Sequence, residues 1–402
     1  MAIATLIGPG TLATVQDDLW HIALSDNSGQ TDFKYVFDIY NATTSQQLIR
    51  VKLYPEPTNG RGYFNAAGIV RNEIKFDWFV PVQSTASYKP FLNNIALDGR
   101  AGVSYNIFVG EDYSGITTLN MASGNTVAYN FAPPLYKRRQ IDYSSIDGWY
   151  SNRPLITKCQ LQQKLLIPYK AEGVNVATGM AIRVKANNQA SAYTGNLTNF
   201  LTTQFIQLDI GPETLNLYLQ ANGVAYPYID SGTSFYDVEV YSLDTTSYST
   251  KLRVNIECQP RYSPINLYFI NQWGMFDTAC FNLASRLSMT TERKTFSKKD
   301  NTFNNSSVTY FDSKNVYNES KVNYGSKSDY NHKLTMDFPT DEEYEWLAEL
   351  ISSPQIYADI EGNYYPITIQ DTNYEYSKYE NNHLKQLEIT IELNQTRFGF
   401  RR

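Results

Sequence analysis

Short runs in which apolar and polar residues alternate constrain the fold of this chain more than any other feature. The clearest run is Thr250–Cys258, in which Leu252, Val254 and Ile256 alternate with basic and other polar side chains. Successive side chains of a strand point to opposite faces of its sheet, so this run predicts one buried face and one face in water. Many such runs, separated by turn residues, predict a mainly β protein built from antiparallel β-sandwiches.

Two proline-rich breaks divide the chain into three regions. Pro133–Pro134 and Pro260–Pro264 interrupt the alternating runs, and proline supplies no backbone donor to a sheet. The length of 402 residues suits two or three domains. We therefore predict tandem β-sandwich domains at 1–132 and 133–262, followed by a C-terminal α+β domain at 263–402.

The alternation also predicts individual strands. In the first region, Phe33–Ile39 and Ile49–Leu53 form a hairpin, Val103–Val109 forms a strand, and a turn at Ser123–Asn125 closes a second hairpin. In the second region, the predicted strands are 162–167, 181–185, 205–210, 215–219, 236–241 and 250–258.

Two segments of the chain echo each other. Phe33–Pro57 and Phe235–Pro260 each consist of a strand, a turn rich in Thr or Ser, a strand with alternating basic residues, and a proline. This echo fits two domains of one fold, and it also fits two unrelated hairpins.

The C-terminal region contains the one helix that the sequence predicts. Thr340 suits the N-cap position and Glu343 follows three residues later, which is the pattern of a capping box. Apolar residues then repeat with a helical period until the chain reaches Ser352-Ser353-Pro354; they are Tyr344, Leu347, Ala348 and Ile351. Strands are predicted from Ile265 and over 364–369 and 385–393, and the polar stretch 297–331 is predicted to be an arm that orders on binding a neighbour.

No pattern of catalytic or metal-binding residues is present. The three histidines, His21, His332 and His383, have no partners at the spacing of a triad, and we expect them to be surface or strand residues. The three cysteines, Cys159, Cys258 and Cys280, are far apart and show no CxxC spacing. We therefore predict no enzyme, cofactor or metal site, although sequence alone leaves open a carboxylate pair assembled from distant strands.

The charge of the chain argues against nucleic acid as a partner. The formal net charge is −6, whereas nucleic-acid binding needs a basic surface. Three basic clusters lie beside aromatic residues: Lys137–Arg139, Arg293-Lys294 with Lys298-Lys299, and Arg397 with Arg401-Arg402. We interpret them as solvated loops or interface patches, with nucleic-acid contact as the alternative.

Two longer patterns stand at the ends of the chain. The first joins Tyr35–Tyr40 (YVFDIY), Val51–Pro55 (VKLYP) and Gly62–Asn65 (GYFN). The second joins NQWGMFDT at 271–278, ERK at 292–294, EYEWLAELISSP at 343–354 and YPITI at 365–369. Both patterns resemble virion structural proteins of tailed bacteriophages that infect Bacteroidota, including crAss-like phages, whereas the region from about 133 to 260 carries no such resemblance.

The resemblance implies a structural subunit of a virion, in the tail, baseplate or neck, that is synthesised in the host bacterial cytoplasm. It implies as partners copies of the same chain in a ring or other homo-oligomer and other tail or neck proteins. No stretch of the sequence approaches 18 apolar residues, so we expect no membrane partner. The alternative function is a carbohydrate-binding or host-receptor-binding module of a phage tail or a cell surface. For that alternative, Trp149-Tyr150 and Trp273 are candidates for stacking on sugars, and core packing is the other interpretation of the same residues.

Overall fold

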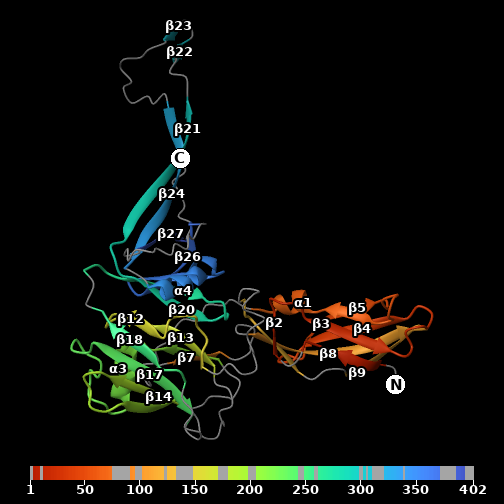
Figure 1. The fold of residues 1–402 in the computed structure, drawn as a ribbon. Coiled ribbons are helices and arrows are strands. Elements are labelled where there is room, and N and C mark those ends of the chain that lie inside the picture. The colour runs from red at the N-terminus through yellow and green to blue at the C-terminus, as the bar shows by residue number, and fades with distance from the viewer. Residues whose placement is uncertain are drawn as a thin grey trace. The chain divides into compact units, whose positions relative to one another are not determined.

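The chain is mainly β, as the alternating runs predict, and most of its strand pairs are antiparallel. The structure is a computed structural model (Figure 1). None of the helices in the part of the chain that it describes has the length and apolar character that a membrane crossing requires. The described residues are 3–9, 12–74, 91–95, 102–121, 125–132, 148–170, 180–197, 205–242, 249–257, 261–297, 302–304, 307–309, 321–337, 340–371 and 386–393.

The N-terminal region is a sandwich of two sheets, with strand orders β1-β3-β6 and β2-β10-β8-β4-β5. The short strand β9 pairs with β8 beside this second order. The elements are β1 (Ile3–Ile7), β2 (Leu12–Thr14), β3 (Trp20–Ser25), β4 (Lys34–Asn41), β5 (Gln47–Leu53), β6 (Gly62–Asn65), α1 (Ala67–Arg71), β8 (Gly102–Tyr113), β9 (Ile116–Met121) and β10 (Thr126–Tyr129). The core lies between the sheets and includes Tyr35, Phe37, Ile39, Phe64, Val103, Tyr105, Ile107 and Val109.

One predicted hairpin of this region is confirmed and the other is wrong. The strands β4 and β5 pair antiparallel, with Tyr35 opposite Leu53. In contrast, β9 and β10 each pair with β8, over 108–113 and 102–105 respectively. Because β8 has 12 residues, it accepts both short strands in succession. The turn expected at 123–125 lies largely outside the described residues.

The middle region is a second sandwich, with strand orders β11-β13-β16-β7 and β12-β18-β17-β14-β15. Its elements are β7 (Phe91–Ile95), β11 (Gly148–Trp149), β12 (Ile156–Cys159), β13 (Leu166–Lys170), β14 (Met180–Ala186), β15 (Tyr193–Leu197), β16 (Phe205–Asp209), α3 (Pro212–Ala221), β17 (Phe235–Ser242) and β18 (Leu252–Ile256). Aliphatic and aromatic side chains of both sheets and of α3 form one core, which includes Leu165, Ile167, Ile182, Val184, Leu208, Leu215, Tyr218, Leu219, Tyr236, Val238 and Val254.

The helix α3 corrects the prediction of a strand at 215–219. Pro212 stands at the start of the helix, where its missing donor costs nothing, and Gly211 is extended before it. Asp209 fixes this start because its carboxylate accepts hydrogen bonds from the Gly211 backbone N–H (3.0 Å) and the Thr214 hydroxyl (2.7 Å). The strand predicted from the period-two pattern of Leu215–Leu219 is therefore wrong, because the buried Leu215, Tyr218 and Leu219 follow helical spacing.

The C-terminal region contains a seven-stranded sheet of order β20-β19-β25-β26-β27-β24-β21. Its strands are β19 (Ile265–Ile270), β20 (Phe276–Phe281), β21 (Arg286–Ser297), β24 (Lys321–Met336), β25 (Ile356–Ile360), β26 (Asn363–Ile369) and β27 (Leu387–Leu393). Two short strands, β22 (Thr302–Asn304) and β23 (Ser307–Thr309), pair with each other. The helix α4 (Asp341–Ser352) is the predicted one, so this region is α+β as expected.

The buried face of α4 differs from the predicted face. The helix buries Trp346, Leu347 and Leu350, whereas Tyr344 and Ile351 are only partly buried. The reason is Trp346, whose indole N–H donates to the buried carboxylate of Asp277 at 3.0 Å. A tryptophan that is held by a buried acceptor turns the helix toward that acceptor.

The compact units of the chain do not follow three consecutive regions. One unit comprises 1–259, 268–279 and 342–354, and the other comprises 260–267, 280–341 and 355–402. In addition, β7 lies within the predicted first region but pairs with β16 of the second sandwich. Pairing between strands that are far apart in sequence leaves no local pattern from which it could be predicted.

The sequence echo has a structural counterpart. In both segments the two strands pair antiparallel, with Asp38 directly opposite Arg50 and Asp237 directly opposite Arg253. Each arginine donates two hydrogen bonds to its aspartate, at 2.7 and 2.6 Å in the first pair and at 2.8 and 3.1 Å in the second. The two hairpins occupy different places in their sheets, however, since β5 ends its strand order whereas β18 lies between β17 and β12. The shared pair is therefore a local likeness of two hairpins and does not decide between the two interpretations of the echo.

Candidate assembly surfaces

The strands β21 and β24 form a two-stranded ribbon that runs on beyond the other strands of its sheet (Figure 1). The strand β24 pairs with β27 only over Asn331–Met336, so Lys321–Tyr330 pairs with β21 alone in the described part of the chain. At about 3.3 Å per residue, these ten residues extend roughly 30 Å. Eleven of the twelve residues of β21 are exposed.

One face of this ribbon, the apolar face, continues the buried side of the sheet. Leu287 lies opposite His332, which in turn lies opposite the fully buried Ile391 of β27. Two residues further along, Met289 lies opposite Tyr330. Leu287 is 61% exposed and Met289 is 57% exposed, so apolar side chains that face the core elsewhere in the sheet face water here.

The far end of the ribbon carries a second apolar group. A β-bulge between Lys294 and Thr295 shifts the register, and the rings of Phe296 and Tyr324 meet at a centroid distance of 6.1 Å. Both rings are about half exposed, at 49% and 46%. Large exposed apolar side chains on a strand edge are typical of surfaces that contact another protein.

The opposite face of the ribbon is charged. Glu292 lies opposite Lys327, and Arg286 lies opposite Lys333. Over the whole ribbon, six basic residues stand against two acidic residues, which are Arg286, Arg293, Lys294, Lys321, Lys327 and Lys333 against Glu292 and Asp329. The ribbon therefore carries a net charge of +4 within a chain whose net charge is −6.

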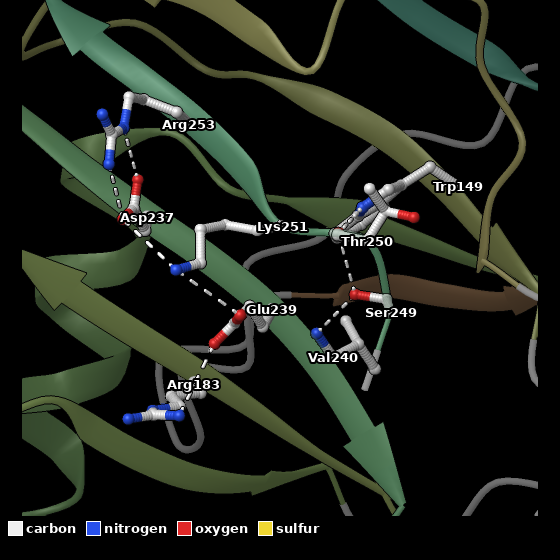
Figure 2. A network of polar contacts seen from close by, with 9 residues as sticks. All are labelled: Trp149, Arg183, Asp237, Glu239, Val240, Ser249, Thr250, Lys251 and Arg253. Carbon is white, nitrogen blue, oxygen red and sulfur yellow. Dashed lines mark hydrogen bonds and ion pairs between the residues drawn. The ribbon is translucent and has the colours of Figure 1, made fainter. Parts of the chain in front are cut away.

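The second sandwich has a charged sheet face of a different kind (Figure 2). Figure 2 shows Lys251 between Asp237 and Glu239, at 3.9 and 3.8 Å, with Arg253 beside the first carboxylate and Arg183 beside the second. The guanidinium of Arg253 also lies 4.2 Å from the centre of the Phe235 ring. Each cation of this row thus has a carboxylate within ion-pair distance in the same sheet. The three cations share two carboxylates, so the row keeps a net charge of +1, which is smaller than that of the ribbon.

An exposed apolar face on the N-terminal sandwich was not predicted from the sequence. Ile7, Ile22 and Tyr63 lie in one row across β1, β3 and β6, next to Trp20. Trp20 is 47% exposed and Ile7 is 50% exposed. The strand β3 buries His21, Ala23 and Ser25 instead, so its small and polar residues face inward.

The buried histidine of β3 has a structural role. The Nε2 atom of His21 lies 3.1 Å from the hydroxyl of Tyr105, and both residues are fully buried. Burial lowers the pKa of His21 to about 4, so the ring is neutral at pH 7. A neutral histidine without contact to solvent cannot exchange protons with a substrate.

Two buried carboxylates also serve the fold. Asp277 accepts hydrogen bonds from Ser151 (2.6 Å), Trp346 (3.0 Å) and Asn271 (3.3 Å), which come from three distant segments. Burial raises the pKa of Asp277, against the opposing effect of the nearby Arg153. Burial likewise raises the pKa of Asp209, which accepts hydrogen bonds from Gly211 and Thr214 at the start of α3. Neither carboxylate is open to a ligand, since each is at most 1% exposed.

The remaining sequence candidates are scattered. Tyr150 and Trp273 are buried and pack on Phe131, so they form no sugar platform, while the Trp149 indole donates to the Thr250 carbonyl at 2.7 Å. Cys159 is buried in the second core. Arg293 and Lys294 lie on the ribbon, and Asp341–Glu343 form the first turn of α4. His383, Cys258, Lys137–Arg139, Lys298-Lys299, Arg397 and Arg401-Arg402 lie outside the described residues.

No metal site is apparent in the described ranges, since no group of three His, Cys, Asp or Glu side chains there could hold an ion. The predicted arm at 297–331 falls partly on β24, and its residues 298–301, 305–306 and 310–320 lie outside the described ranges. The exposed structure begins earlier than predicted, at Arg286, because β21 is the other half of the ribbon.

Comparison with known proteins gives little further information. No protein-family model and no curated protein matches the chain. Similar solved structures include the FN1–FN3 domains of chicken CNTN1, at 12% identity and a TM-score of 0.20, covering 64% of this chain and 67% of that chain. A two-domain fibronectin type III segment of chicken tenascin aligns at 8% identity and a TM-score of 0.22, covering 63% and 97%.

The plexin A4 extracellular region, domains 1 to 8, aligns at 10% identity and a TM-score of 0.19, covering 63% of this chain and 27% of that chain. Such low TM-scores carry no argument about ancestry or function. The description of the first two regions as β-sandwiches therefore depends on their own sheets and cores.

Proposed function

We propose that this chain is a non-enzymatic structural subunit of a bacteriophage virion, in the tail, baseplate or neck, that acts by assembling with other subunits. The observation that carries the proposal is the ribbon, which exposes Leu287, Met289 and Phe296 on a two-stranded structure. The sequence resemblance at both ends of the chain supports the virion as the place of assembly.

The physical argument concerns what such a ribbon needs. An isolated pair of strands has marginal stability in water, because it buries little apolar surface. A partner that covers the apolar face removes those side chains from water and adds stability to the ribbon. The unpaired edge of β21 also offers backbone donors and acceptors to an incoming strand, within the described residues.

A complementation experiment tests this function. A phage with an amber mutation in this gene is expected to produce particles with incomplete tails, as seen by electron microscopy, and the wild-type chain supplied in trans is expected to restore them. The double variant Leu287→Ser/Met289→Ser should fail to restore complete particles. Normal tails without any supplied chain would refute the proposed function.

The exposed apolar face of the N-terminal sandwich favours a second candidate, a carbohydrate or host-receptor binding module. Trp20 offers an exposed ring beside Asn65, which donates to the Asp18 carboxylate at 2.7 Å. An aromatic ring next to carboxylate and amide groups suits stacking and hydrogen bonding to a sugar. Glycan-array binding that is lost in Trp20→Ala would favour this candidate, and an array without any binding would remove it.

A further inference from the structure

The charge of the ribbon is opposite to that of the rest of the chain. With +4 on the ribbon and −6 on the whole chain, the remaining residues carry −10. Opposite charges on two surfaces speed their encounter and fix which surfaces meet. The ribbon of one copy is therefore opposite in charge to the remaining residues of a second copy.

Four of the six ribbon cations have no counter-ion among the described residues. Lys327 pairs with Asp329 at 3.0 Å and Lys333 pairs with Glu388 at 2.5 Å. For Arg286, Arg293, Lys294 and Lys321, no carboxylate of the described residues lies within ion-pair distance. This differs from the row on the second sandwich, where Arg183, Lys251 and Arg253 are all paired. The ribbon thus retains surplus positive charge for a partner.

We propose that the ribbon of one copy docks on an acidic surface outside the ribbon of a second copy, in a head-to-tail contact. Ribbon-to-ribbon contact is disfavoured, because it would bring together two surfaces of +4 each. The apolar face adds burial of Leu287 and Met289 to the charge attraction. A head-to-tail contact generates a ring if the rotation between copies closes and an open filament if it does not.

This inference rests on the proposed assembly function, because it names the partner of the same ribbon. Cross-linking of a mixture of isotope-labelled and unlabelled full chains tests it, using a zero-length reagent that joins lysine to carboxylate. We expect links between copies from Lys294, Lys321 or Lys327 to Asp or Glu residues outside the ribbon. Links only from ribbon to ribbon, or none between copies, would overturn the inference.

Charge reversal provides a second measurement with a matched control. Arg293→Glu/Lys294→Glu should weaken self-association at least tenfold in sedimentation velocity. Arg61→Glu/Lys185→Glu changes the net charge equally at exposed positions outside the ribbon and should weaken association much less. Equal effects of both variants would overturn the inference.

Failure of the self-docking inference can be distinguished from failure of the virion role. If purified chains show no ribbon links but virions contain the chain with its ribbon linked to a different protein, self-docking is wrong and the virion role stands. If the chain is absent from virions, the virion role fails, while links between purified copies would still report self-docking.

Discussion

Removing the apolar side chains from the ribbon should abolish assembly without unfolding the chain. Full burial of a Leu or Met side chain contributes about 1.5–3 kcal/mol. Leu287 is 61% exposed and Met289 is 57% exposed, so a partner that covers them gains over half of that contribution from each. For Leu287→Ser/Met289→Ser we therefore expect a loss of roughly 2–4 kcal/mol of association free energy. This loss corresponds to a dissociation constant that is about 30-fold to 900-fold higher.

The matched control uses two aliphatic residues outside the ribbon that are slightly more exposed than Leu287 and Met289. Ile116 is 68% exposed and Ile156 is 61% exposed, so Ile116→Ser/Ile156→Ser removes a similar apolar surface from β9 and β12. Sedimentation velocity over a concentration series measures association, and urea unfolding measures monomer stability, which should change by at most about 0.5 kcal/mol per substitution. The reasoning is refuted if the ribbon variant associates like the wild-type chain, or if the control is weakened as much.

Three further predictions concern stability and protease sensitivity. Asp277→Ala should lower the free energy of unfolding by about 3–5 kcal/mol in urea, because it leaves the buried Asn271 and Trp346 donors and the partly buried Ser151 hydroxyl without their acceptor. Trp346→Phe should cost about 1–2 kcal/mol, since it removes one of these donors. A loss below 1 kcal/mol for Asp277→Ala would contradict the structural role of this carboxylate. For Asp209, the folded-state pKa is raised above the unfolded value, so the folded state holds its proton more tightly. The contribution of Asp209 to the free energy of unfolding is then full below about pH 4 and declines as the pH rises toward the raised pKa. Asp209→Asn should remove this decline. A variant whose stability depends on pH as the wild-type chain does would contradict this role of Asp209. Trypsin should cleave the isolated chain first at the ribbon, at sites such as Arg293 or Lys327, and assembly should protect these sites; a ribbon that resists cleavage in the isolated chain would argue against an arm that depends on a neighbour.

Alternating residues were sufficient to predict the class of the fold and several of its strands. The runs around β17 and β18 place apolar residues on one face, and the structure buries that face. The strand β4 was also found from its alternation, although it is buried on both faces, with Val36 and Asp38 fully buried. The helix α4 was also predictable, because helix-favouring signals stand at both of its ends. Local pattern is informative where one face of an element is buried and the other is wet.

Elements whose burial depends on distant partners could not be predicted in this way. The sequence Leu215–Leu219 suits strand and helix equally, and Asp209 and Pro212 decide in favour of the helix. The strand β3 buries His21 and exposes Trp20, which reverses the usual expectation for these side chains. In both cases the deciding contact comes from outside the run.

The candidate site was predicted only in part. The polar composition of 297–331 indicated an exposed arm, but nothing in that stretch shows that β21 forms its other half. The alternating residues Leu287 and Met289 suggest an ordinary buried strand face, and only the register with β24 and β27 shows that this face is uncovered. The charge surplus of the ribbon becomes visible once its two strands are known to pair.

Quantitative mass spectrometry of purified virions, separated into head and tail fractions, tests the central claim most directly. The account predicts several copies of this chain per particle, retained with the tail fraction. Absence of the chain from virions would contradict the account and would leave the exposed face around Trp20 as the surface to test for glycan binding.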